Sequence, residues 1–292
     1  MTPTKEQLAF FDTFGFIRFS GAFRDEADRI IEAFEGVWAS HGGGHNEQTH
    51  DYTRRSAILP FIDQSEYLSS LIDHPLIDGF ASAVLGPDYN YTASDGNFYV
   101  GDTNWHSDNF AQKYTNIKVA FYLDKVTRDT GCLRVIPGSH RRGDRYADSL
   151  HEVVPQSTVN HAEERWGLHG SEVPAYPIES VPGDVLIFNQ AIKHGSWGGS
   201  DRRRMFTINF SERYRDEDID QLREEIGGMA GFWTESAYGE KMVETASPQR
   251  MVHLEQRMAN DDHLPELVAK AKAEMLEPSR GGGQFDVAGK KM

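Results

Sequence analysis

Residues 182–210 have the sequence PGDVLIFNQAIKHGSWGGSDRRRMFTINF, which predicts two strands joined by a polar connection. Pro182 and Gly183 form a turn that leads into the apolar run 184–188, and residues 205–211 form a second β-rich run. The connection carries His194. This stretch is therefore typical of antiparallel β structure with chemically useful side chains between its strands.

The same pattern of short β-rich runs and turn residues extends back along the chain as far as Pro87. Short β-rich runs are separated there by Gly, Pro, Asn and Asp, at residues 89–93, 97–100, 117–123, 132–136 and 172–178. Many short strands with turn residues between them predict a sandwich or jelly roll. We expect a mainly β protein with flanking helices, whose core is a double-stranded β-helix.

Helical patterns flank this block on both sides. Thr4 and Gln7 form a capping box at the start of a helix that ends at Gly15, and a short strand follows at 16–20. Further helices are predicted at residues 25–40, 65–72, 75–85, 216–226, 250–258 and 264–275, and a solvated polar loop at 41–57. We expect one domain over residues 1–292, divided into N-terminal elements (1–88), the jelly-roll core (89–212), C-terminal helices (213–277) and a loose tail (278–292).

Composition excludes several classes of protein. The chain has 292 residues, 38% of them hydrophobic, with 17 Phe and 11 Tyr, as in a globular protein with an aromatic-rich core. Its formal net charge of −15 argues against nucleic acid or an anionic membrane as the main partner. The single cysteine, Cys132, is expected to be a buried core residue. We expect a cytoplasmic protein that acts on a small molecule, and the sequence leaves its oligomeric state open.

Residues 104–109 place an imidazole and a carboxylate two positions apart, at His106 and Asp108. On a strand these side chains leave the same face, and with a distant second histidine they form the 2-His-1-carboxylate triad that holds non-haem Fe(II). The spacing alone carries little weight, because 12 histidines and 45 acidic residues give roughly two such pairs by chance. The other pair, His253 and Glu255, lies in a helix-forming stretch and is predicted to be solvated.

The order of the motifs strengthens the prediction that His106 and Asp108 are metal ligands. It is followed by a β-rich run that ends in the turn Pro137-Gly-Ser139, then by His194, and ten residues later by Arg204. A guanidinium at the start of a strand can bind a carboxylate through two charge-assisted hydrogen bonds. Such a residue suits a cofactor that binds metal at one end and needs its far carboxylate anchored.

With these motifs in this order, residues 89–212 resemble the phytanoyl-CoA dioxygenase family of Fe(II)- and 2-oxoglutarate-dependent oxygenases. The first helix and Phe14-Gly-Phe-Ile-Arg-Phe19 resemble the start of that family. The resemblance implies Fe(II), 2-oxoglutarate and O2 as cofactors, and hydroxylation of a C–H bond of a small molecule with release of succinate and CO2. Desaturation, cyclisation and demethylation remain open, as do regiochemistry and stereochemistry.

The resemblance also implies roles for individual residues. His106, Asp108 and His194 take the metal positions. Asp108 favours oxygenation, because halogenating relatives have Gly or Ala in its place. Arg204 takes the position that binds the 5-carboxylate of 2-oxoglutarate, and Ser196 takes the position that assists it.

The assignment of the arginine involves a choice of register. Arg202, Arg203 and Arg204 are adjacent, and the spacing from the distal histidine varies by about a residue across the family. We choose Arg204 because the strand sequence Met-Phe-Thr-Ile-Asn-Phe follows it directly.

Further pocket residues are expected on the strands around the first motif. Lys118, Thr103 and Asn97 are candidates for contacts with 2-oxoglutarate, and the candidates for pocket walls are Trp105, Asn109, Arg134, Tyr99 and Trp197. If buried, Arg134 needs a partner, either an anionic group of the substrate or a salt bridge within the sheet.

Two other functions are compatible with a jelly roll. One is a cupin-like metalloenzyme that does not use 2-oxoglutarate, and the other is a non-catalytic protein that binds a small ligand. Loops 41–57, 109–116 and 141–170 are expected around the barrel mouth, and their polar composition favours a polar or anionic small molecule.

Overall fold

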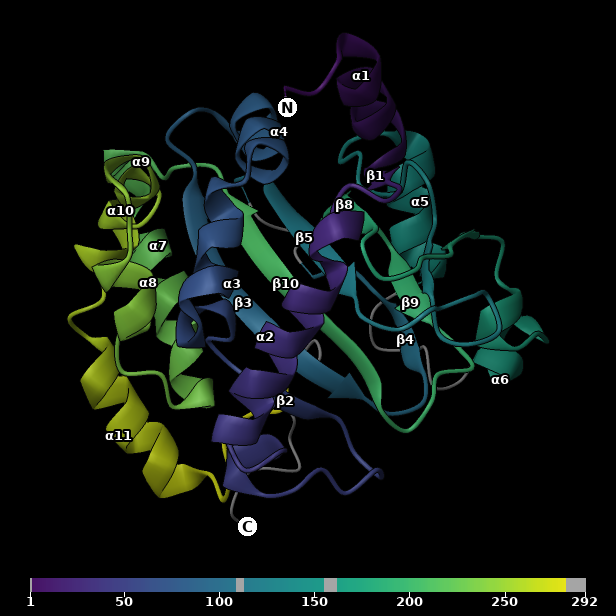
Figure 1. The fold of residues 1–292 in the computed structure, drawn as a ribbon. Helices are drawn as coiled ribbons and strands as arrows, with labels where there is room; N and C mark the ends of the chain where they lie inside the picture. The colour runs from purple at the N-terminus through teal and green to yellow at the C-terminus, as the bar shows by residue number, and fades with distance from the viewer. Residues whose placement is uncertain (1, 109–112, 155–161, 282–292) are drawn as a thin grey trace.

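Two antiparallel sheets form the centre of the computed structural model, which describes residues 2–108, 113–154 and 162–281 (Figure 1). The larger sheet has the strand order β1 (Phe16–Phe19), β8 (Val185–Asn189), β5 (Asn116–Tyr122), β10 (Arg203–Ser211), β3 (Asn90–Tyr99) and β2 (Ser56–Ile58). The smaller sheet has the order β4 (Thr103–His106), β9 (His194–Ser196), β6 (Leu133–Val135) and β7 (Tyr176–Ile178). The expected fold, a jelly roll with flanking helices, is confirmed.

Helices cover the outer side of the larger sheet (Figure 1). The α-helices are α1 (Lys5–Phe14), α2 (Ala27–Ser40), α3 (Glu66–Ser70), α4 (Pro75–Leu85), α5 (Arg145–Val153), α6 (Ala162–Trp166), α7 (Ile219–Gly227), α8 (Glu240–Glu244), α9 (Pro248–Val252), α10 (Glu255–Met258) and α11 (Leu264–Glu274). In α2, Phe34 and Trp38 recur at helical spacing and pack against Phe98 of β3, with the Trp38 and Phe98 rings stacked 4.0 Å apart. Burial of this aromatic face holds the helix to the sheet.

The first helix begins and ends where its sequence predicts. The Thr4 hydroxyl accepts a hydrogen bond from the Gln7 amide at 3.2 Å, and the Gln7 side chain accepts one from the Thr4 amide at 2.9 Å. Gly15 ends the helix in a left-handed conformation with φ of 81°, which glycine adopts without strain. The chain then enters β1, which pairs with β8.

Strand β3 corrects the prediction of two separate strands at 89–93 and 97–100. Ser94, Asp95 and Gly96 are turn-forming residue types, but here they continue one strand. The Ser94 hydroxyl accepts hydrogen bonds from the amides of Phe61 and Ile62, and the Phe61 ring lies against the backbone of Gly96. Tertiary contacts therefore override the local preference for a turn.

The predicted boundaries of the β core are too narrow, because β1 and β2 from the N-terminal segment form the two edges of the larger sheet. Three short strands, β2, β4 and β9, were absent from the predicted runs. Two helices, α5 and α6, interrupt the expected loop 141–170. The predicted C-terminal helices are confirmed in place, although the region 250–258 is divided into α9 and α10.

Two segments predicted to be solvated contain buried histidines. In the loop 41–57, His45 is 3% exposed, and its Nδ1 and Nε2 atoms each lie 2.9 Å from a carbonyl oxygen, of Ala57 and of Pro278 respectively. His253 is also 3% exposed, with its ring stacked on Tyr89 at 3.7 Å. The loose tail predicted from residue 278 is corrected for residues 278–281, which pack against this loop, while residues 282–292 lie outside the described part of the chain.

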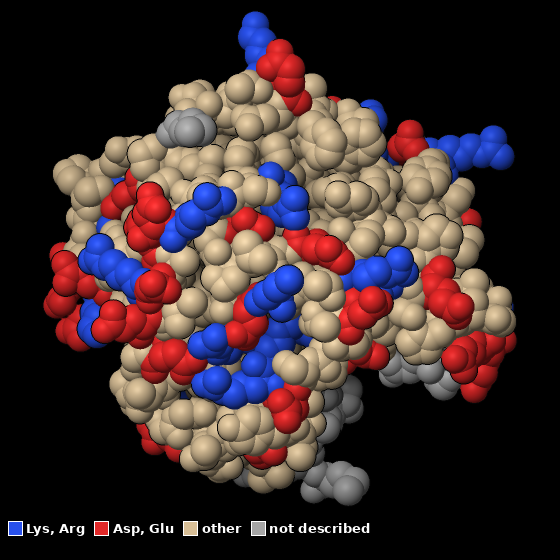
Figure 2. All heavy atoms as spheres, turned by 45° about the vertical axis from the view of Figure 1, so that its right-hand side comes forward, with Lys and Arg blue, Asp and Glu red and all other residues tan. Residues whose placement is uncertain are grey.

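The surface is mixed in charge in spite of the net charge of −15. Figure 2 shows acidic and basic side chains interspersed over one face, with basic ones gathered near its centre and bordered by acidic ones. Among the described residues, no helix has both the length and the apolar character needed to cross a membrane. Cys132 is buried in the core, as predicted.

Candidate active site

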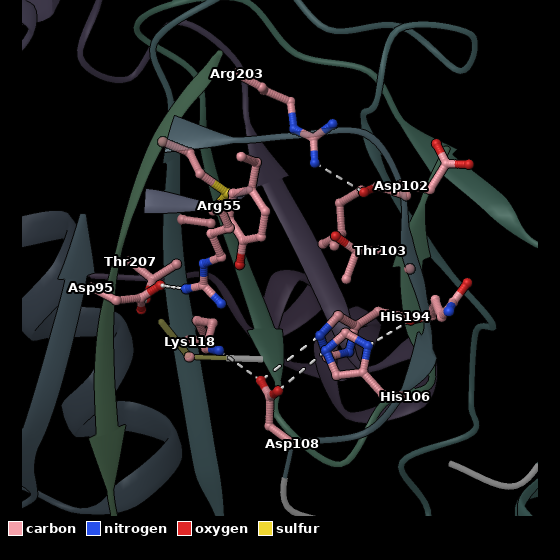
Figure 3. Close-up of a pocket in the computed structure, with 18 of the residues that line it drawn as sticks. Arg55, Asp95, Asp102, Thr103, His106, Asp108, Lys118, His194, Arg203 and Thr207 are labelled. Atoms are coloured by element: carbon pink, nitrogen blue, oxygen red, sulfur yellow. Dashed lines mark hydrogen bonds and ion pairs between the residues drawn. The ribbon is translucent and has the colours of Figure 1, made fainter. Parts of the chain in front are cut away.

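The predicted metal ligands lie together between the two sheets. Strand β4 ends at His106 and β9 begins at His194, and these two residues are direct partners in the antiparallel pairing of the strands. Asp108 follows two residues after His106, and its amide donates a hydrogen bond to the Gln190 carbonyl at 2.9 Å. Nitrogen and oxygen atoms of the three side chains all lie within 4.8 Å of one another (Figure 3).

The two histidines are held in the same tautomer by the backbone. His106 Nδ1 donates to the Asn104 carbonyl at 2.7 Å, and His194 Nδ1 donates to the Ile192 carbonyl at 2.9 Å. A carbonyl oxygen can only accept, so each ring carries its proton on Nδ1 and presents the lone pair of Nε2. Burial and the neighbouring His106 lower the pKa of His194 to about 3, which keeps its ring neutral.

The Asp108 carboxylate faces these two lone pairs. Oδ1 lies 3.4 Å from His106 Nε2, and Oδ2 lies 3.8 Å from His194 Nε2. The Asp108 side chain is 20% exposed. Burial alone would raise its pKa, but the ammonium group of Lys118 holds the pKa well below its usual range. Lys118 Nζ donates to Oδ2 at 2.6 Å. The carboxylate is therefore ionised and oriented.

These separations fit one metal ion. Metal–nitrogen and metal–oxygen bonds of about 2.1 Å at right angles put neighbouring ligand atoms roughly 3 Å apart. The observed distances of 3.4 and 3.8 Å need only small side-chain movements to reach that value. Two imidazoles and one carboxylate on one side of an ion leave its other positions open.

A cavity of about 600 Å³ contains this cluster. That volume lies in the range of sites that hold small molecules. Of the predicted site residues, those that line the cavity are Tyr99, Thr103, Trp105, His106, Asp108, Lys118, His194 and Ser196. Apolar walls are formed by Leu59, Val100, Ala120, Leu133, Phe188, Met205 and Phe232.

The position of Arg204 corrects the predicted register by one residue. Arg204 points away from the cavity, where Nε bonds Asp124 Oδ1 at 3.1 Å and Nη1 bonds Glu35 Oε1 at 2.8 Å. Arg203 lines the cavity instead, is 3% exposed, and donates from Nη2 to the Ser196 hydroxyl at 3.1 Å (Figure 3). Side chains alternate along β10, so adjacent arginines face opposite sides of the sheet.

Arg203 is a buried cation without an acidic partner among the described residues. Its hydrogen bonds go to the Ser196 hydroxyl and to the Gly101 carbonyl, at 3.1 and 3.4 Å, and its Nε has no partner there. Burying a guanidinium in this way costs free energy unless an anion pairs with it. The side chain therefore fits a carboxylate that enters through the cavity.

Three other predicted site residues do not line the cavity, and a fourth is not described. Asn97 bonds Arg55 and Asp95, and Trp197 packs on Trp105 in a separate apolar cluster. Arg134 is 7% exposed and donates to the backbone carbonyls of Ser171 and Arg128, and no acidic side chain among the described residues pairs with it. Asn109 lies outside the described residues.

Several cavity residues were not among the predicted ones. Arg55, Asp95 and Thr207 lie on one side of the cavity, with Arg55 coming from the end of loop 41–57 (Figure 3). The sequence signal for Arg55 was a polar loop rich in His and Arg, but nothing in the local pattern indicates which of its side chains turns inward. Asp95 was not predicted because it lies among turn-forming residue types, which suggested a turn where the structure has the continuous strand β3.

The family model of phytanoyl-CoA dioxygenase (PhyH) matches residues 14–206. Among curated proteins, "Dioxygenase lolE1" of Epichloe uncinata is 36% identical over 85 residues, which is 29% of this chain and 27% of that protein. "Probable phytanoyl-CoA dioxygenase" of Caenorhabditis elegans is 30% identical over 99 residues, 33% of this chain and 30% of that protein. The matches thus span less than a third of these curated relatives.

Solved structures share the fold at lower identity. The 2-oxoglutarate-dependent carbocyclase SnoK from nogalamycin biosynthesis aligns with a TM-score of 0.55 and 20% identity, covering 76% of this chain and 90% of that one. EctD from S. alaskensis with 2-oxoglutarate and 5-hydroxyectoine gives 0.53 and 21%, over 72% and 76%. HygX from Streptomyces hygroscopicus with nickel and 2-oxoglutarate gives 0.55 and 16%, over 73% and 89%.

Proposed function

This chain belongs to the phytanoyl-CoA dioxygenase family, and we propose that it is an Fe(II)- and 2-oxoglutarate-dependent dioxygenase that hydroxylates a small molecule. The observation that carries the proposal is the presence of two features in one cavity. A cluster of two histidines and one aspartate lies there together with Arg203, a buried cation with no acidic partner in the described part of the chain. The cavity thus has a place for a metal and a place for a carboxylate.

His106, His194 and Asp108 would hold the metal through the two Nε2 atoms and a carboxylate oxygen. When bound, Fe(II) with 2-oxoglutarate and O2 supplies the oxidant that hydroxylates a C–H bond, while 2-oxoglutarate becomes succinate and CO2. Lys118 keeps its hydrogen bond to Asp108 Oδ2, which leaves Oδ1 to face the metal position. Phe188 lies 5.1 Å from the His194 ring and limits access of water to it.

Arg203 would bind the far carboxylate of 2-oxoglutarate, with Ser196 beside it. Leu133, Tyr122 and Met205 line the same cavity and supply apolar contacts for the methylene carbons of that molecule. Binding of the dicarboxylate removes the cost of an unpaired buried guanidinium. This coupling favours 2-oxoglutarate over a cofactor with a single carboxylate at the metal.

Anaerobic titration with Fe(II) and 2-oxoglutarate tests the proposal. We expect the weak visible charge-transfer absorption of a bidentate 2-oxo acid on iron, and succinate release once O2 and a substrate are added. His106→Ala and Asp108→Ala should weaken Fe(II) binding at least about 100-fold, since changes to outer partners alone cost 10- to 100-fold. His169→Ala, which changes an exposed histidine, is the matched control.

Other outcomes would assign the protein to a different class. Metal binding without the absorption band would indicate a cupin-like metalloenzyme that does not use 2-oxoglutarate. Failure to bind Fe(II) at all would indicate a non-catalytic binding protein.

A further inference from the structure

Arg55 enters the cavity from the end of loop 41–57, on the side opposite the two histidines (Figure 3). Both the Arg55 and the Arg203 guanidinium groups lie near the Tyr99 ring. The Arg55 guanidinium is 4.4 Å from the centre of that ring, and the Arg203 guanidinium is 5.3 Å from it. The cavity is therefore lined by two guanidinium groups. That of Arg203 is used by the proposed 2-oxoglutarate site, and that of Arg55 is ion-paired with Asp95 at 3.1 Å.

The side chain of Arg55 is rigidly held on one edge. Nε and Nη2 donate to Asn97 Oδ1 at 2.8 and 2.5 Å, and Nη2 also donates to Asp95 Oδ2 at 3.1 Å. The two N–H groups of Nη1 have no acceptor among the described residues. A guanidinium fixed at one edge with free donors at the other is prepared for a ligand.

The neighbouring carboxylate of Asp95 already accepts hydrogen bonds from three side chains. Asp95 Oδ1 accepts from the Thr207 hydroxyl, and Oδ2 accepts from Asn97 Nδ2 at 2.6 Å as well as from Arg55. The Thr207 hydroxyl in turn accepts from Asn209 Nδ2 at 3.3 Å. Because the unused hydrogen-bonding groups of Arg55 are donors, a ligand bound here must supply acceptor oxygens.

The C-terminal segment fixes the backbone at this point. Arg280 Nη1 donates to the Arg55 carbonyl at 2.9 Å, and Arg280 is itself paired with Glu277 at 2.9 Å. Gly281 lines the cavity, and a Cβ at that position would lie 2.9 Å from Arg55 Nη1. A glycine at this position avoids a Cβ that would crowd Arg55 Nη1.

We propose that Arg55 determines substrate specificity by binding a carboxylate of the substrate through Nη1. The inference rests on the proposed function, in which the metal and 2-oxoglutarate occupy the part of the cavity near His106 and Arg203. A carboxylate oxygen accepts from the N–H groups of Nη1 and forms a charge-assisted hydrogen bond with the guanidinium. The substrate class is therefore a small carboxylic acid, whose C–H bonds lie between this anchor and the metal.

The probes are matched pairs of an acid and its primary amide: phenylacetate, indole-3-acetate and octanoate with phenylacetamide, indole-3-acetamide and octanamide. Their binding is measured by the rise in Tm of the metal-free protein, which does not depend on iron. At least one acid should bind at least tenfold more tightly than its amide. Arg55→Gln should abolish that preference, and Arg55→Lys should retain part of it.

Arg54→Gln is the matched control, because Arg54 is the adjacent arginine, is 59% exposed and does not line the cavity. It should leave the preference for acids unchanged. The inference is wrong if no acid binds the wild-type protein more tightly than its amide, or if Arg55→Gln binds the acid equally well. It is also wrong if Arg55→Gln weakens 2-oxoglutarate instead of the acid. Absence of the iron–2-oxoglutarate absorption, with the acid preference intact, would contradict the proposed function and leave the carboxylate anchor standing.

Discussion

At the scale of single residues, the decisive contrast lies between Arg203 and Arg204. The two side chains are adjacent in sequence, carry the same charge, and differ in what surrounds them. Arg204 has two carboxylates, Asp124 and Glu35, on the outer face of the sheet. Arg203 faces the cavity and has hydroxyl and carbonyl oxygens only. The arginine with an incomplete set of partners is the one prepared to bind a ligand.

We predict opposite effects for the two matched substitutions. Arg203→Met should weaken 2-oxoglutarate binding by about 2–4 kcal/mol, or roughly 30- to 1000-fold, because it removes a charge-assisted contact to a buried carboxylate. Arg204→Met should leave that affinity unchanged and cost at most about 1 kcal/mol of the free energy of unfolding, because its ion pairs are partly exposed. The checks are titration with 2-oxoglutarate and urea unfolding. Loss of 2-oxoglutarate binding in Arg204→Met alone would restore the register chosen from the sequence.

At the scale of elements, the cavity depends on how α2 and β3 are packed. Gly96 lets the Phe61 ring lie against the middle of β3, where a Cβ would come within 2.0 Å of the ring. Phe61 in turn contacts Phe34 of α2, at 5.1 Å between ring centres. Because β3 also carries Asp95 and Tyr99 into the cavity, this contact fixes two of the cavity walls.

Two glycine substitutions should therefore change stability in opposite directions. Gly96→Ala is expected to reduce the free energy of unfolding by about 1–3 kcal/mol, because the buried Phe61 ring must move. Gly36→Ala in α2 meets nothing within 4 Å and should raise it by about 0.5–1 kcal/mol, since alanine favours the helix. Urea unfolding of both variants measures the difference. A Gly96→Ala protein as stable as the wild type would show that the strand can shift away from Phe61.

At the scale of the whole molecule, buried histidines connect distant segments in their neutral form. The His45 ring lies between the carbonyls of Ala57 and Pro278 and, when neutral, donates to one of them. The half-buried His140 donates to the Asp12 carbonyl, and His253 donates to the Tyr89 carbonyl. Burial lowers the pKa of each of these residues. Burial and the charge of Lys193 lower the pKa of His151 to about 4.

The free energy of unfolding should therefore decrease as the pH is lowered. A histidine whose folded pKa lies below its unfolded value of about 6.5 stabilises the protein above that pH and loses this contribution as the pH drops toward the folded value. For His151 the window runs from about 6.5 to about 4. Urea unfolding of the metal-free protein at pH 7.5, 6 and 5 should show a loss of a few kcal/mol, at about 1.4 kcal/mol per pKa unit and group.

Asp63 acts in the opposite direction and supplies a control. Burial raises its pKa to about 6, so its contribution to stability increases as the pH falls from about 6 to 4. Asp63→Asn removes this compensation and should make the acid loss steeper. A stability that is constant between pH 7.5 and 5 in both proteins would contradict the assignment of neutral buried histidines.

Much of the fold was predictable because its signals are local. The capping box at Thr4, the glycine stop at Gly15 and the apolar face of α2 lie within a few residues of the structure they determine. The pair at His106 and Asp108 was predictable in the same way, because a two-residue spacing on a strand places both side chains on one face. Its completion by His194 followed from the order of the motifs, and the structure brings the three together.

What only the tertiary structure decided depends on contacts between distant segments. Residues 182–210 predicted two strands with an arginine cluster between them, but the pairing of β10 with β3 and β5 decides which arginine faces inward. The inward position of Arg55 depends on Asn97 and Asp95 of β3 and on Arg280, which lies 225 residues further along the chain. Local sequence determines the period and the ends of an element. Contacts with segments far away in the sequence determine which face of an element is buried and what it packs against. A short stretch of sequence does not contain those segments.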